Sequence, residues 1–223
     1  MLVYEMKLSA KEDLAMILPI PVPQKTGEKS VKFIDLKPYA EFFRHMELGF
    51  PSRSPDAPPA AGGRSGTGAF TKLDVVNVGS FEASFVPSVN DFVRLDERFR
   101  LPSGTWDKLP QYKDYGFAVF KLKKDATKTH PMAFNFPRAN RTQLFFPTVH
   151  IHDGEVHKVA EFDHTLYAQV DADHRFRNND WTESIRPAGM FMQIARCAGV
   201  VDAHSHVYKQ TMDGEQENKD VIV

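Results

Sequence analysis

The segments GFAVFKLK (116–123) and PMAFNF (131–136) decide the fold class of this 223-residue chain. Both are rich in apolar and aromatic residues over the length of a β-strand, and a short polar stretch separates them. Three similar segments follow at short intervals, namely QLFFPTVHI (143–151), EVHKV (155–159) and FDHTLYAQV (162–170). Breaks of this length are typical of antiparallel hairpins and leave no room for a crossover helix between parallel strands.

The first half of the chain adds strands and a helix to this pattern. Four further strands are predicted at LVYEMKL (2–8), VKFIDL (31–36), LDVVNV (73–78) and SFEASFV (80–86). A helix is predicted between Pro38, which suits a first helical position, and Gly49, which suits a helix end. Its apolar face holds Tyr39, Phe42, Phe43 and Met46, which recur at helical spacing.

Two more helices complete the prediction. Ser88 and Asp91 can open a short helix with an apolar face made of Phe92, Leu95 and Phe99. A last helix is predicted from Pro187 to Gly199, and it would bury Met190, Phe191, Ile194 and Ala198. The sequence therefore predicts an α+β fold that is β-rich, with a mainly antiparallel sheet and a few short helices.

One composition shift divides the chain. Residues 51–69 are almost entirely Pro, Gly, Ser and Ala with a few charges, which predicts a flexible linker or long loop. Residues 1–50 would then be N-terminal strands and a helix, and residues 70–223 a β-rich main body that can pack with them as one domain. Residues 3–21 also resemble residues 119–137 in residue type, which leaves open two related lobes.

Charge and cysteine content exclude several functions. The 28 basic and 29 acidic residues nearly cancel, so we expect no nucleic-acid partner. No apolar run is long enough to span a membrane, so we expect a soluble chain with no membrane partner. Cys197 is the single cysteine, which excludes an internal disulfide and a thiolate-rich metal site. A lone thiol and an N-terminus unlike a signal peptide predict a cytoplasmic protein.

The stretch VHIHDGEVH (149–157) is the strongest candidate for a functional site. Asp153-Gly154 is a typical two-residue hairpin turn, and this turn would set His152 opposite Glu155 and His150 opposite His157. Opposed residues share a face of the sheet. We therefore predict one polar face and, on the other side, an apolar face. The polar face holds His150, His152, Glu155 and His157, and the apolar face holds Val149, Ile151 and Val156.

This polar face has two interpretations. Three imidazoles and a carboxylate could bind Zn, Fe or Mn, and would then support a metal-dependent enzyme of the hydrolase or oxygenase type. The alternative is a solvated face of an ordinary antiparallel sheet. His164 is expected on the same side of its strand as Phe162 and Leu166, which favours a core histidine over a further metal ligand.

A second histidine motif occurs at VVDAHSHVY (200–208). It resembles the Asp-x-His-x-His strand of amidohydrolase-type metal enzymes, with His204 and His206 at the ligand positions. In that family the strand opens a barrel of about 250 residues, whereas 17 residues follow His206 here. We therefore interpret the segment as a strand with Val201, Ala203 and Val207 inward and its polar residues outward.

No complete catalytic signature is found. The chain lacks a G-x-S-x-G elbow, an H-E-x-x-H helix and a complete phosphate loop. Cys197 lies next to alanines in the predicted last helix, which favours an inert, partly buried thiol over a nucleophile. The catalytic residues are thus unknown, and no cofactor-binding fingerprint is found. We expect a binding or interaction domain for a small molecule or protein, with the metal-dependent enzyme as the alternative.

Overall fold

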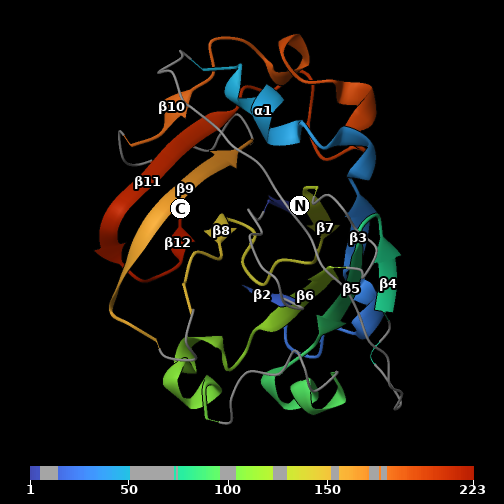
Figure 1. The fold of residues 1–223 in the computed structure, drawn as a ribbon, viewed down its shortest axis with the longest axis vertical. Helices are drawn as coiled ribbons and strands as arrows, with labels where there is room; N and C mark the ends of the chain where they lie inside the picture. Colours follow the sequence, from blue (N-terminus) through green and yellow to red (C-terminus); the bar gives the residue numbers. More distant parts are fainter. Residues whose placement is uncertain are drawn as a thin grey trace.

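The computed structural model describes residues 1–5, 15–50, 73, 75–95, 104–122, 130–151, 156–170, 176 and 180–223. The predicted linker 51–69 therefore lies outside the described residues. Within them, twelve strands form four sheets, and each strand pair is antiparallel. The helices are short, which confirms the predicted β-rich, mainly antiparallel α+β fold (Figure 1).

The strands are arranged as follows. A four-stranded sheet has the order β2-β6-β5-β4, formed by β2 (Ala15–Ile20), β6 (Gly116–Leu122), β5 (Phe81–Val86) and β4 (Val75–Val78). A three-stranded sheet has the order β1-β7-β3, formed by β1 (Leu2–Tyr4), β7 (Met132–Asn135) and β3 (Lys32–Asp35). Another has the order β10-β11-β9, formed by β10 (Thr182–Glu183), β11 (Tyr208–Glu217) and β9 (Val159–Ala168). Strands β12 (Val221–Ile222) and β8 (Phe145–Phe146) form a two-stranded sheet.

The one α-helix in the described part of the chain, α1 (Phe42–Glu47), follows the 3-10 helix η2 (Lys37–Tyr39), as predicted for this region. The other 3-10 helices within the described ranges are η1 (Glu28–Ser30), η3 (Val89–Arg94), η5 (Trp106–Lys108), η6 (Pro110–Tyr112), η7 (Ala188–Met190) and η8 (Ile194–Arg196). η3 begins after Ser88, whose hydroxyl donates a hydrogen bond to Asp91 (2.7 Å), in line with the predicted short helix.

Alternating residues of the central strands bury three layers of core. Ala118 and Phe120 of β6 face a cluster shared with the three-stranded sheet, whereas Phe117 and Val119 face a second cluster on the opposite side. Strand β7 behaves in the same way, because Met132 and Phe134 join the first cluster and Ala133 joins the cluster that contains residues of α1, η7 and η8. Burial on both faces explains why these segments are continuously apolar in sequence.

The described strands of the two similar segments, 3–21 and 119–137, pair with each other, β1 with β7 and β2 with β6. Val3 lies opposite Ala133 in one sheet, and Ile17 lies opposite Val119 in another. An offset of 116 residues converts one pair into the other, so the two ladders share one antiparallel register. The similarity therefore corresponds to strands that lie side by side in the described structure.

The predicted last helix is wrong. In its place the chain forms two separate 3-10 turns, η7 and η8, at the end of the molecule that also carries α1 (Figure 1). Met190 is 65% exposed and Ala198 adopts a positive φ of 49°. The physical reason is visible at Gln193, whose backbone N–H donates to the Tyr39 hydroxyl (2.8 Å) and so makes no helical hydrogen bond.

Two predicted strands are shorter than expected. Only Phe145–Phe146 of the segment 143–151 is a strand, and β9 begins at Val159, so 156–158 is not part of it. The side chains of Asn218 and Asp220, about 70 residues later in the sequence, form hydrogen bonds with the backbone of this region. No helix among the described residues is long and apolar enough to cross a membrane.

Candidate functional site

The segment around His150 keeps its predicted apolar side. Val149, Ile151 and Val156 pack on the cluster that contains Phe117 of β6. His157 is exposed. His152 and Glu155 lie outside the described residues, so the predicted four-residue metal site stays a prediction.

His150 and His164 lie in contact. The Nε2 atoms of the two imidazoles are 3.1 Å apart, and the ring centroids are 4.7 Å apart, so the Nε2 corners face each other. The His150 ring also stacks on Phe162, with centroids 4.6 Å apart and an interplanar angle of 25°. His164 is thus a half-buried histidine beside Phe162, as the core interpretation predicted, and it also touches the predicted site.

The Asn218 side chain holds the backbone of this segment. Its Oδ1 accepts a hydrogen bond from the His150 N–H (2.7 Å), and its Nδ2 donates to the carbonyl oxygens of His150 (2.9 Å) and His157 (3.0 Å). The Asn218 backbone N–H donates to the Lys158 carbonyl (2.9 Å). One amide therefore replaces the ladder hydrogen bonds that strands would have made here, and it fixes the position of His150.

The Asp220 side chain also binds the backbone of this segment. Its Oδ1 accepts hydrogen bonds from the backbone N–H groups of Thr148 (2.9 Å) and Val149 (3.3 Å), and its Oδ2 accepts one from the Tyr112 hydroxyl (2.6 Å). Burial raises the pKa of Asp220, while these hydrogen bonds oppose that rise. Burial and the nearby Asp220 charge raise the pKa of Tyr112, so this phenol remains the hydrogen-bond donor.

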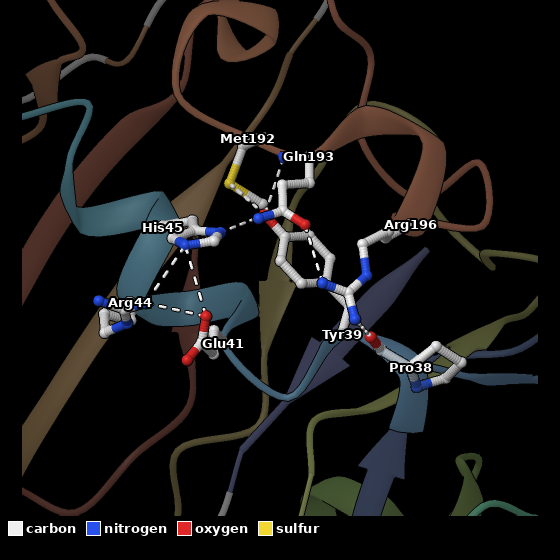
Figure 2. A network of polar contacts seen from close by, with 8 residues as sticks. All are labelled: Pro38, Tyr39, Glu41, Arg44, His45, Met192, Gln193 and Arg196. Carbon is white, nitrogen blue, oxygen red and sulfur yellow. Dashed lines mark hydrogen bonds and ion pairs between the residues drawn. The ribbon is translucent and has the colours of Figure 1, made fainter.

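A second polar network joins η2 and α1 to the η7–η8 region (Figure 2). The buried Tyr39 hydroxyl accepts from Gln193 N–H and lies 2.8 Å from Nδ1 of His45. Nε2 of His45 lies 3.7 Å from a Glu41 carboxylate oxygen, and Arg196 lies over the Tyr39 ring. Burial raises the pKa of Tyr39. The hydroxyl is used on both sides by protein groups, so this network serves to join the two segments.

A third polar group joins α1 to the sheet of β9 and β11. Oε2 of Glu47 accepts a hydrogen bond from the Tyr167 hydroxyl (2.5 Å), and its other oxygen forms a short ion pair with Lys209. Tyr167 and Lys209 are opposite each other in the β9–β11 ladder. Burial raises the pKa of Tyr167, which makes it a hydrogen-bond donor to Glu47 and a poor general base.

The amidohydrolase-like motif is a turn. Residues 200–207 contain no strand, which corrects the predicted one, although Val201 and Val207 are buried as predicted. Asp202 accepts hydrogen bonds from the backbone N–H of His204 (3.1 Å) and from the Ser205 hydroxyl. This carboxylate stabilises its own turn, which explains its place in the motif.

His206 and Ser184 are in contact, but the Ser184 hydroxyl directs its proton to a backbone carbonyl. Nδ1 of His206 lies 2.8 Å from the Ser184 carbonyl oxygen and 3.5 Å from the Ser184 hydroxyl. That hydroxyl donates to the Arg186 carbonyl (2.8 Å) and accepts from Val207 N–H (3.0 Å). Cys197 is fully buried and burial raises the pKa of its thiol, in line with the predicted inert role.

No group of three or more histidine, cysteine, aspartate or glutamate side chains that could bind a metal occurs within the described ranges. The contact between His150 and His164 is the feature nearest to such a group. Asn218 and Asp220 position the segment that carries His150, and they were not identified from the sequence. They carry no periodic or motif signal, and they act on residues about 70 positions earlier.

Comparison with known proteins adds little. No protein-family model matches the chain, and no curated protein matches its sequence. Two crystal structures of a mutated baculovirus P35 after caspase cleavage are similar, with 12% identity and TM-scores of 0.42 and 0.44. The alignments cover 97% of this chain and 88% or 90% of those chains. Likeness this remote is no basis for a function, which is therefore argued from the residues of this chain.

Proposed function

We propose that this chain is a binding domain that takes up an extended segment of a protein partner along the outer edge of β4. The observation that supports this proposal is the place of β4 in its sheet. Among the described residues, β4 pairs with β5 alone and forms the end of the order β2-β6-β5-β4. A strand end of this kind presents backbone N–H and C=O groups that can pair with an added strand.

The register identifies which backbone groups face outward. Val78 and Phe81 flank the two-residue turn Gly79-Ser80, in which Gly79 has a positive φ of 57°. The residues that flank such a turn form a hydrogen-bonded pair, and such pairs alternate along an antiparallel ladder. Val76 and Val78 therefore bond to β5, whereas the N–H and C=O groups of Val75 and Asn77 point away from it.

The side chains of β4 suit an apolar partner strand. Val75 is 49% exposed and Val76 is 45% exposed, although neighbouring residues of a strand point to opposite faces. The strand VVNV contains no charged residue or proline, the features with which proteins commonly protect such edges. An extended peptide with apolar side chains on both faces would therefore add its own strand beside β4.

A phage-displayed library of random eight-residue peptides tests the proposal. Peptides selected on the 223-residue chain are expected to bind Asn77→Pro at least tenfold more weakly, because proline removes an outward N–H and keeps the bonds to β5. Asn77→Ala is the matched control and should bind as the wild type does. Equal binding to the proline variant, or no enriched peptide, would refute the proposal. Backbone NMR shifts confined to 75–78 give a second, mutation-free readout.

A metal-dependent enzyme is the second candidate, on His150, His152, Glu155 and His157 with Zn, Fe or Mn. The observation that favours it is the fixed, half-buried position of His150 beside a second imidazole. We also propose a cytoplasmic location, which is supported by the single, buried cysteine. Metal analysis of untagged protein, compared with the His150→Ala, His152→Ala double variant, tests the metal candidate.

A further inference from the structure

We propose that His150 and His164 together bind one divalent transition-metal ion through their Nε2 atoms. The proposal deepens the metal candidate, but its ligand set differs from the four predicted residues and shares only His150 with them. Of the histidines in the predicted hairpin it uses His150 alone, and it adds a strand residue that the sequence pattern assigned to the core. It is independent of peptide binding at β4, which belongs to another sheet.

The separation of the two nitrogens fits a shared ion. Imidazole nitrogens lie about 2.1 Å from a bound zinc ion, so two of them 3.1 Å apart would subtend an angle of about 95° at the metal. This angle is close to the right angle of octahedral and square-planar coordination and smaller than the tetrahedral angle. Cu²⁺ and Ni²⁺ therefore fit the pair as it stands, and Zn²⁺ fits after a small opening of the rings.

Two imidazole lone pairs that face each other at this distance repel, so a proton or a metal ion must lie between them. Either one Nε2 carries a proton and donates it to the other, or an ion occupies the position of that proton. Asp163 Oδ1 lies 3.6 Å from Nδ1 of His164, which electrostatically favours a proton on Nδ1 and leaves the lone pair on Nε2. That tautomer is the one that binds metal through Nε2.

The surroundings hold the rings in place. Asn218 bonds both backbone groups of His150, and the ring is stacked on the buried Phe162, so little ordering entropy remains to be lost on binding. Four exposed carboxylates form two facing pairs on the same β9–β11 ladder as His164. They are Asp163 opposite Asp213 and Glu161 opposite Glu215. They alternate with Phe162 and His164 along the ladder and so project from its other face, and Asp163, whose Oδ1 lies 3.6 Å from Nδ1 of His164, is the member that reaches the pair.

Titration of the full, untagged chain with Cu²⁺ alone tests the inference. We expect one saturable site by calorimetry, and an electron paramagnetic resonance spectrum with hyperfine splitting from two imidazole nitrogens. His150→Gln and His164→Gln should each weaken binding at least tenfold. His157→Gln is the matched control, because His157 belongs to the predicted hairpin site and is exposed, and it should leave binding unchanged.

Three results would overturn the inference: no saturable Cu²⁺ binding, unchanged binding by His164→Gln, or equal losses in His157→Gln and His164→Gln. If a glutamine variant fails to fold, Zn²⁺-induced shifts of the histidine ring nitrogens in the wild type decide the question. Shifts at His150 and His164 support the site, and shifts elsewhere refute it. Loss of metal binding with retained peptide binding separates this inference from the proposed function.

Discussion

Strand β6 and the segment 147–151 lie against each other in the structure, but different interactions hold them in place. β6 is hydrogen-bonded between β2 and β5 and buries Phe117, Val119 and Phe120 on its two faces. The segment 147–151 has no ladder of its own, and the side chains of Asn218 and Asp220 bind its backbone. Periodic apolar burial defines the first region, and two polar side chains define the second.

This difference between the two regions explains why the candidate site lies in the segment 147–151 and not in β6. A strand buried on both faces positions its residues rigidly, but it leaves no polar group for chemistry. A segment held by side chains keeps its half-exposed imidazole beside the core while its backbone is still satisfied. The cost is that its geometry depends on a few hydrogen bonds. Substitutions in the two regions should therefore differ in size and in their effect on the histidine pair.

The largest effect is expected in the apolar region. Phe120→Ala removes a ring that is 2% exposed and contacts Phe33, Phe81 and Phe134. The free energy of unfolding should fall by about 3–5 kcal/mol, because the buried surface is lost and a cavity remains. Urea denaturation measures this loss. Leu48→Ala, at a position that is 65% exposed, should change stability by less than about 0.5 kcal/mol. A Phe120→Ala cost near that of the control would contradict the layered core.

A substitution in the polar region should lower the free energy of unfolding by less and should disturb mainly the residues around it. Asp220→Ala leaves the Tyr112 hydroxyl and two backbone N–H groups without their acceptor, and should cost about 2–3 kcal/mol. Hydrogen exchange should speed up first at Thr148, Val149 and His150. Asp107→Ala, an exposed aspartate, is the control. If hydrogen exchange also became faster throughout β6, the two regions would not be stabilised independently of each other.

The sequence predicted the apolar region well and the polar region poorly, for one physical reason. Local periodicity predicts strands β4, β5, β6 and β7, because the apolar or polar character of each residue indicates whether that residue is buried. The extension of the strand beyond Phe146 was wrong because Asn218 and Asp220 compete for that backbone from about 70 residues away. The split of the last helix likewise depends on the Tyr39 hydroxyl, which accepts from Gln193.

The same limit applies to the candidate site. The sequence singled out His150, and it placed Val149, Ile151 and Val156 on the apolar side, which the structure confirms. It could not pair His150 with His164, because that contact depends on how β9 passes the segment. Alternation within β9 assigned His164 to the core side, and the structure places it at the edge of that core, beside Phe162.

The smallest expected effect is a pH dependence that originates from Asp220. Burial raises the pKa of this carboxyl above its unfolded value of about 3.9, so the native state binds its proton more tightly than the unfolded state does. Its contribution to stability is therefore fully present below about pH 3.9 and is lost as the pH rises through the raised native value. Asp220→Asn keeps an acceptor for the backbone N–H groups but cannot titrate. The stability of the wild type relative to this variant should thus decline as the pH rises above about 3.9, as measured by urea denaturation at each pH. A difference that grows with pH would mean that the three hydrogen bonds to the carboxylate outweigh its burial. In that case the ionised Asp220 carboxylate would hold the polar region through its three hydrogen bonds, and the neutral acceptor of the asparagine variant would be a poor substitute wherever that carboxyl is ionised.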